Sequence, residues 1–130
     1  MCNKSALYVA NNVPQDVAVN GTVNFGLPVR RLGQNIHIYG GNVVTKGAGY
    51  YLFNATFDFT GTVGTTNITF YDNGVEIPGA FVIVTTEAAA TNITIPFMTR
   101  NTCGMEHVIT AVVTGQPLTD AYVSMVVEKI

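Results

Sequence analysis

The fold is decided by residues 49–59, which read GYYLFNATFDF. Side chains alternate between the two faces of a β-strand, so every second residue of this segment belongs to the same face. One face is apolar throughout and predicts a core strand: Tyr51, Phe53, Ala55, Phe57 and Phe59. The other face begins with Tyr50 and Leu52 and becomes polar only toward Asp58. The first half of this second face is too apolar to be left in water.

The last strand has the same two-sided pattern. In residues 121–128, one face holds four apolar side chains, and the other holds Tyr122 and Val126 beside Ser124 and Glu128. A two-layer sandwich buries only one face of each strand, so the second apolar face predicts contact with a neighbouring subunit. The alternative interpretation is that Tyr50 and Tyr122 are ordinary surface tyrosines whose hydroxyls lie in water.

The rest of the chain is rich in β-branched and aromatic residues separated by turn formers, and no amphipathic helix stands out. Gly40-Gly41 and Asn73-Gly74 are typical of two-residue hairpin loops. The expected strands are Ser5–Ala10, Thr22–Phe25, Asn35–Tyr39, Asn42–Thr45, Tyr50–Phe59, Thr66–Tyr71, Val75–Ile77, Ala80–Thr86, Asn92–Thr99, His107–Val113 and Ala121–Glu128. This pattern predicts an all-β, antiparallel two-sheet sandwich.

Composition narrows the classes of partner. The chain has 130 residues, of which 11% are charged, and a formal net charge of −2. Nothing in this balance attracts a nucleic-acid backbone or an anionic membrane, so we expect neither as a partner. The scarcity of charge also favours an oligomer that hides apolar surface. The apolar run from Ala6 to Ala10 is too short for a signal peptide or a membrane span, so we expect no export.

Two groups of motifs carry a resemblance to known proteins. Gly49–Phe53, followed by the strand, Asn-Gly turn and strand of Thr69–Ala80, resembles the jelly roll of the tumour-necrosis-factor and C1q superfamily. More narrowly, the chain is similar to small proteins encoded among the structural genes of tailed phages and prophages. The matching elements are Ser5–Tyr8, Val29–Asn35, Gly47–Tyr51, Gly74–Ala80 and Val126–Ile130.

The resemblance implies a homotrimeric jelly roll whose inner sheets meet at an axis. The residues that we expect at the trimer interface are Tyr8, Tyr50, Leu52, Asn54, Met98, Tyr122 and Val126. No Gly-x-y stalk repeat is present, so we expect residues 1–16, or the base of the sandwich, to attach the trimer to its particle, with residues 17–130 as the jelly-roll domain. Lys4, Arg30 and Arg31 are candidates for docking on a capsid, and an intersubunit salt bridge explains the arginine pair equally well.

The implied function is structural: a non-enzymatic head-decoration or head-fibre protein, made in the host cytoplasm and displayed on the virion. The alternative is a receptor- or glycan-binding head domain of a tail or baseplate fibre. That alternative requires exposed aromatic residues in a groove, for which the candidates are Tyr39, Phe70, Tyr71 and Phe81. A bacterial C1q-like surface protein is disfavoured by the missing export signal.

Catalytic and metal sites are not predicted. His37 and His107 do not have the spacing of a cupin metal centre, and Glu106-His107 beside Cys103 does not form an evident Cys-His pair. We therefore expect no enzyme activity, no cofactor and no metal. An axial calcium ion held by Asp58, Asp72 or Asp120 is an alternative to solvated acids and an Asx turn at these positions. Cys2 and Cys103 are either idle thiols or a disulfide.

Overall fold

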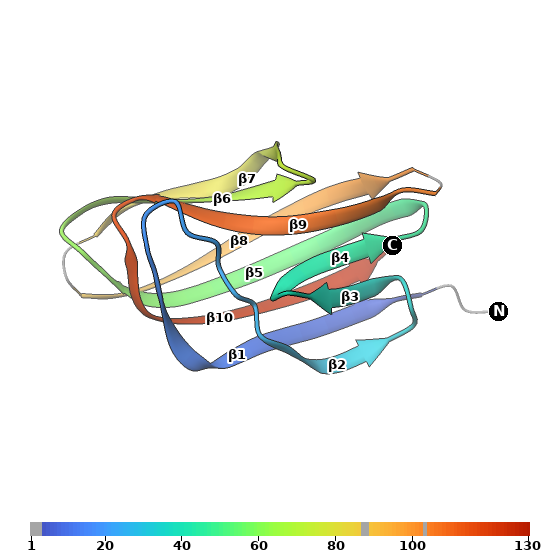
Figure 1. Ribbon diagram of the computed structural model, residues 1–130, viewed down its shortest axis with the longest axis horizontal. Coiled ribbons are helices and arrows are strands. Elements are labelled where there is room, and N and C mark those ends of the chain that lie inside the picture. The colour runs from blue at the N-terminus through green and yellow to red at the C-terminus, as the bar shows by residue number, and fades with distance from the viewer. Residues whose placement is uncertain (1–3, 87–88, 103) are drawn as a thin grey trace.

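The computed structural model describes residues 4–86, 89–102 and 104–130. Within these residues the chain forms ten strands, shown in Figure 1. In chain order they are β1 (Ala6–Val17), β2 (Leu27–Leu32), β3 (Ile36–Tyr39), β4 (Asn42–Lys46), β5 (Gly49–Gly61), β6 (Gly64–Asp72), β7 (Val75–Thr86), β8 (Ala90–Asn101), β9 (Glu106–Gly115) and β10 (Leu118–Lys129). None of the described residues form a helix long and apolar enough to cross a membrane.

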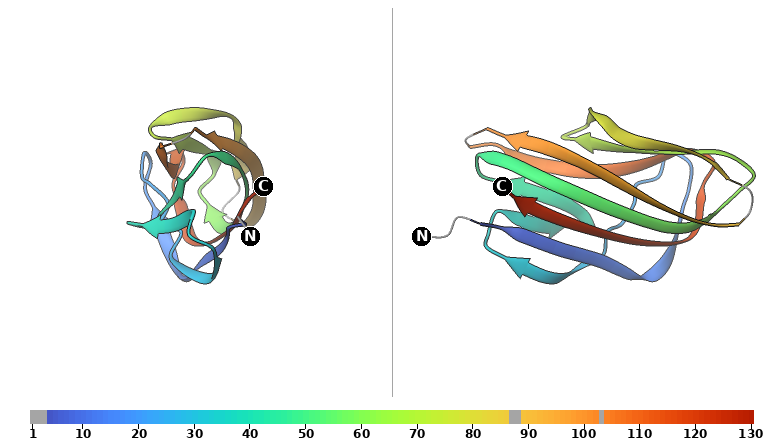
Figure 2. Two further views of the ribbon diagram at one scale, coloured as in Figure 1. Left: turned by 90° about the vertical axis from the view of Figure 1, so that its right-hand side faces the viewer. Right: turned by 180° about the vertical axis from the view of Figure 1, so that it is seen from behind.

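The strands form two antiparallel sheets packed face to face, as the end-on view in Figure 2 shows. Sheet A has the order β2, β1, β10, β5, β8, and sheet B has the order β3, β4, β9, β6, β7. Most consecutive strands lie in different sheets, so the chain crosses repeatedly from one layer to the other. The predicted all-β antiparallel sandwich is confirmed.

The core lies between the sheets and follows the predicted alternation. The apolar set of β5, from Tyr51 to Phe59, and the apolar set of β10, from Ala121 to Val127, are both buried. Aromatic rings pack there: the ring centres of Phe53 and Phe97, both in sheet A, are stacked 4.6 Å apart, and Phe70 of sheet B lies tilted against Phe97 with ring centres 4.5 Å apart. Their packing fixes which face of each sheet points outward.

The two predicted hairpins are confirmed, and their loop residues have the positive φ values of mirror-image turns. Gly40 and Gly41 have φ of 59° and 79°, and Asn73 and Gly74 have φ of 49° and 82°. These turns join β3 to β4 and β6 to β7. The second hairpin brings Asp72 and Asn73 to the start of β9, where they form part of a polar cluster.

Three strand predictions were wrong. Residues 22–25 form only an isolated bridge at Thr22, although Phe25 is buried in the core. The strands expected at residues 75–77 and 80–86 are one strand, β7, with a register shift beside β6. The edge strand β2 was not expected, because all six of its residues are exposed and it shows no alternation.

The expected attachment segment, residues 1–16, contains most of β1. This strand is an inner member of sheet A, paired with β2 on one side and β10 on the other. Residues 6–16 are therefore part of the sandwich. Met1, Cys2 and Asn3 lie outside the described residues, as does Cys103, so an attachment role for this segment and a Cys2–Cys103 disulfide remain untested predictions.

Candidate functional site

The candidate site is the outer face of sheet A, and cross-strand pairing aligns its side chains in rows. Residues that pair across an antiparallel sheet point to the same face. The middle row runs from β1 to β8 as Tyr8, Val126, Asn54 and Pro96. Arg30 of the edge strand β2 pairs with Tyr8 and extends the same row. Two apolar side chains therefore lie at the middle of the face.

The next row toward the chain termini is also largely apolar. Ala6 pairs with Glu128, Glu128 with Leu52, and Leu52 with Met98. Glu128 is exposed and has Ala6 and Leu52 directly on either side. Its neighbours on the strands beside it are thus apolar, and Lys4 lines the same surface hollow as Leu52 and Glu128.

The two ends of the face carry its remaining tyrosines. At the end near the termini, Tyr50 pairs with Arg100, and the Arg100 guanidinium carbon lies 5.7 Å from the centre of the Tyr50 ring. This is a cation–π contact. At the opposite end, Tyr122 pairs with Asp58, which makes that end acidic.

All seven residues predicted for the trimer interface lie on this one face. Its five large side chains are between 41% and 49% exposed in the single chain: Tyr8, Tyr50, Met98, Tyr122 and Val126. Scattered apolar residues on a surface need no explanation, but a contiguous patch across four strands is typical of a protein interface.

The three docking candidates do not form one patch. Arg30 lies on the outer face of sheet A beside Tyr8. Arg31 pairs with the buried Leu7, so it belongs to the opposite side of β2, and its Nη2 donates a hydrogen bond to Nδ1 of His37 at 2.7 Å. Lys4 is exposed, near the end of sheet A where the chain termini lie. Arg31 therefore joins the edges of the two sheets, and Arg30 and Lys4 remain available to a partner.

The four groove candidates are not brought together. The prediction for Phe70 was wrong, because this side chain is fully buried in the core, where it continues the inward alternation of Thr66 and Ile68. Tyr39 lies on β3 and Phe81 on β7, which are the two opposite edges of sheet B. Tyr71 lies on β6, the neighbour of β7. No common groove for a ligand is formed by this set.

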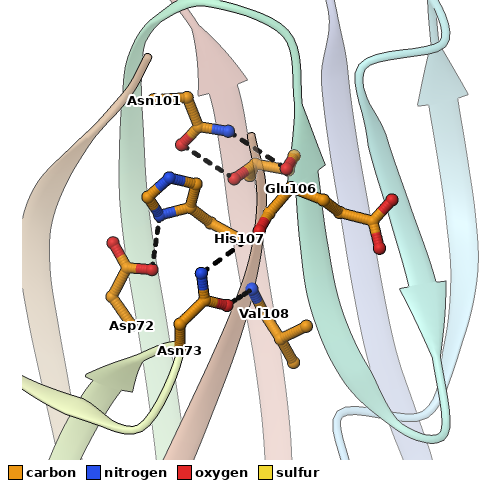
Figure 3. Close-up of polar contacts among 7 residues, drawn as sticks. Asp72, Asn73, Asn101, Glu106, His107 and Val108 are labelled. Carbon is orange, nitrogen blue, oxygen red and sulfur yellow. Dashed lines mark hydrogen bonds and ion pairs between the residues drawn. The ribbon is translucent and has the colours of Figure 1, made fainter. Parts of the chain in front are cut away.

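A polar cluster lies at the end of the sandwich, where the β6–β7 hairpin meets the start of β9 (Figure 3). Nδ1 of His107 is 2.6 Å from Oδ1 of Asp72. The Asn73 side chain accepts a hydrogen bond from the backbone N–H of Val108 at 2.8 Å and donates one to the carbonyl of Glu106 at 3.1 Å. A cavity of about 350 Å³ adjoins the cluster. None of these three contacts was predicted, because 33 to 35 residues separate the partners.

The cluster contains the acid and the histidine of a catalytic triad, and no nucleophile stands beside them among the described residues. In a triad, the second ring nitrogen of the histidine hydrogen-bonds to a hydroxyl or thiol. Nε2 of His107 is buried and has no hydrogen-bond partner in the part of the chain that the structure describes. Cys103, which the sequence places nearby, lies outside those residues. The contacts seen here hold the hairpin against β9.

The acidic residues considered for calcium lie in different places. Asp58 is on the outer face of sheet A, and Asp72 is paired with His107. The backbone N–H of Asp120 donates a hydrogen bond to Asp16 at 3.0 Å. Residues 4–86, 89–102 and 104–130 contain no group of three or more His, Cys, Asp or Glu side chains that could hold a metal ion.

Two buried polar contacts close the end of the core. Asn101 of β8 donates through Nδ2 to the carbonyl of Thr45 on β4 and accepts from the Thr45 hydroxyl, which ties sheet A to sheet B. The Tyr51 hydroxyl donates to the carbonyls of Lys46 and Gly47. Burial raises the pKa of Tyr51 above its ordinary value. These contacts stabilise the fold beneath the exposed face.

Comparison with known proteins supports the fold. No protein-family model matches the sequence, and no curated protein matches it. The solved PRD1 vertex protein P5 is 16% identical with a TM-score of 0.70, over 97% of this chain and 96% of that one. Murine APRIL is 15% identical with a TM-score of 0.73, over 98% and 100% of the two chains. The globular domain of the zebrafish complement 1qA protein is 14% identical with a TM-score of 0.74, over 98% of each chain.

At these identities the likeness concerns the fold alone. Nearly the whole of each chain is matched, so the likeness extends over both sheets. The chain has the jelly-roll fold of the tumour-necrosis-factor and C1q type, and that prediction is confirmed.

Proposed function

We propose that this protein is a homotrimeric, non-enzymatic structural component of a phage particle, displayed on the head as a decoration or head-fibre protein. The trimer forms through the outer face of sheet A. The observation that carries this proposal is the set of exposed apolar side chains aligned in rows across β1, β10, β5 and β8.

The chemistry of this face suits a permanent contact. Its middle rows carry one carboxylate, that of Glu128, among Ala6, Leu52, Met98, Tyr8 and Val126. Burying apolar surface contributes roughly 25 cal/mol per Å². A fully buried aromatic side chain buries ~150–250 Å² of surface. In the single chain the tyrosines of this face are about half exposed, so about half of that area remains to be buried between subunits. Three copies of such a face supply a large association energy.

Two further observations support a place on a virion. The sequence elements that resemble phage structural proteins map onto β1, β2, β5, β7 and β10, which are spread over both sheets. One protein with the same fold is named as a phage vertex protein. The competing receptor-binding role has no comparable support, since its proposed aromatic residues lie apart or in the core.

The experiment has two parts. Size-exclusion chromatography with light scattering of the full chain is expected to give three times 13.9 kDa, and a monomer at micromolar concentration would contradict the trimer. Immunogold labelling of particles from a host that carries the gene is expected to mark the heads. Labelling of tail tips, or no labelling of particles, would overturn the virion assignment.

A further inference from the structure

The positive charges of the chain all lie toward one end of the sandwich. This end, which we call the basic end, is where β1 begins and where β2, β4, β8 and β10 end (Figure 1). The six cations are Lys4, Arg30, Arg31, Lys46, Arg100 and Lys129. Each lies within two residues of the end of its strand. The opposite end, as far as the structure describes it, carries only acids: Asp16, Asp58 and Asp120.

Three of the six cations already have neighbours that occupy them. Arg31 is hydrogen-bonded to His37. Arg30 and Arg100 pair across strands with tyrosines of the outer face of sheet A, which the proposed trimer covers. The remaining cations are Lys4, Lys46 and Lys129. No ion pair among the described residues includes any of these three lysines.

The three lysines start from one hydrogen-bonded surface that spans both sheets. The carbonyl of Lys46 on β4 accepts a hydrogen bond from Nδ2 of Asn35 at 2.7 Å. Oδ1 of Asn35 accepts one from the hydroxyl of Ser5, also at 2.7 Å. The carbonyl of Ser5 accepts one from the backbone N–H of Lys129 at 2.8 Å, and Lys4 directly precedes Ser5. A charged surface held in this way loses little entropy when a partner binds.

Carboxylates lie between the lysines. Lys4 and Lys129 line one surface hollow of about 550 Å³ together with Glu128. Lys46 pairs across the strands with Glu106. A continuous polyanion such as a nucleic-acid backbone would meet these two acids at close range. A protein surface can instead place acids against the lysines and other groups against the glutamates, so the mixed pattern favours a protein partner.

We propose that Lys4, Lys46 and Lys129 dock the basic end of each subunit on a carboxylate-rich surface of a neighbouring virion protein, with the acidic end pointing away from the particle. This proposal rests on the proposed function and supplies its site of attachment. Rotation about a ring axis changes no position along that axis, so the basic ends of three copies lie at one level of the trimer. Three weak electrostatic contacts then act together.

The test is the binding of the purified full chain to particles assembled in a host from which the gene is deleted. If deletion prevents assembly, particles stripped of the protein by salt replace them. Co-sedimentation over a concentration series measures the half-saturating concentration. The double variant Lys4→Gln/Lys46→Gln removes two positive charges from the basic end, and we expect it to raise this concentration at least about tenfold. Salt should weaken the binding of the wild type more steeply than that of the variant.

The matched control is Val63→Glu/Thr119→Glu. It lowers the net charge by the same amount at the opposite end, where both side chains are exposed. We expect the control to bind within about twofold of the wild type. A lysine variant that binds like the wild type, or a control that loses as much binding as the lysine variant, would overturn the proposal.

Circular dichroism and light scattering check the fold and the trimer mass of each variant. Lys46 lies on β4 of sheet B, away from the proposed trimer face. If Lys4→Gln changes the trimer mass, Lys46→Glu alone makes the same change in charge, and the same tenfold loss of binding is expected. Unchanged binding of this single variant then overturns the proposal.

Two further outcomes separate this proposal from the proposed function. Nuclease treatment of the particles is expected to leave binding unchanged, and its loss would assign a nucleic acid as the partner and overturn the proposal. If the wild type does not bind the particles at all, the place on a virion is refuted and the docking proposal with it. If the wild type binds and the lysine variants bind equally well, only the docking end is wrong.

Discussion

Tyr122→Glu should dissociate the trimer while leaving the single chain folded. Tyr122 is 48% exposed on the outer face of sheet A. About 100 Å² of its side chain therefore remains to be buried between subunits, worth roughly 2.5 kcal/mol per subunit. Three copies contribute about 7.5 kcal/mol, which is about 10⁵-fold in the trimer association constant. The new carboxylate also pairs across the strands with Asp58, a second acid, so nothing in its own row neutralises it.

Light scattering across a dilution series measures how far Tyr122→Glu dissociates the trimer, and thermal unfolding measures the stability of the single chain. Tyr39→Glu is the matched control, because Tyr39 is the same residue type, is exposed, and lies on the edge strand β3 of the other sheet. The control should keep the trimer. If Tyr122→Glu has the mass and dissociation concentration of the wild type, the argument that this face is buried fails.

Three other predictions concern the fold and the expected absence of a metal. Tyr51→Phe should cost about 1–2 kcal/mol of unfolding free energy, because the Lys46 and Gly47 carbonyls lose their donor. The raised pKa of folded Tyr51 means that its neutral hydroxyl contributes fully below pH ~10 and that this stability is lost as the pH rises through its folded pKa. Above pH 10, the unfolding free energy from urea titrations should therefore fall less with rising pH for the Phe variant than for the wild type. An equal fall in the two proteins would refute this. Asn101→Ala should cost about 2–3 kcal/mol, since Thr45 keeps a buried hydroxyl and carbonyl without partners; a melting temperature unchanged within a degree would count against the link between sheets. Incubation with EDTA should leave the trimer mass unchanged, and dissociation would reveal a structural metal ion.

Much of the fold could be predicted because it depends on alternation within single strands. Residues 49–59 and 121–128 each separate into a buried set and an outward set, and the structure places both sets as expected. The same reasoning applied to Thr66, Ile68 and Phe70 gives three inward residues. The alternation that buries Phe70 is visible in the sequence, so its place in the core, and not in a groove, could be predicted.

Other features could not be predicted from local patterns. Strand β2 contains Pro28 and two adjacent arginines and is exposed throughout, as edge strands often are, so it shows no periodicity. Asp72 and His107 are 35 residues apart, and Thr45 and Asn101 are 56 apart. Such pairs exist only because the sheet order brings their strands together. The rows on sheet A depend in the same way on registers that are known only from the structure.

Hydroxyl-radical footprinting of the native protein tests most directly whether the outer face of sheet A is covered. The probes are Tyr8, Tyr50 and Tyr122 on the face, with Tyr39, which is 80% exposed on sheet B, as the internal reference. If copies of the chain cover the face, these three tyrosines should be modified far more slowly, relative to Tyr39, than their 41–49% exposure in the single chain allows. Modification of all three in proportion to that exposure would contradict the account.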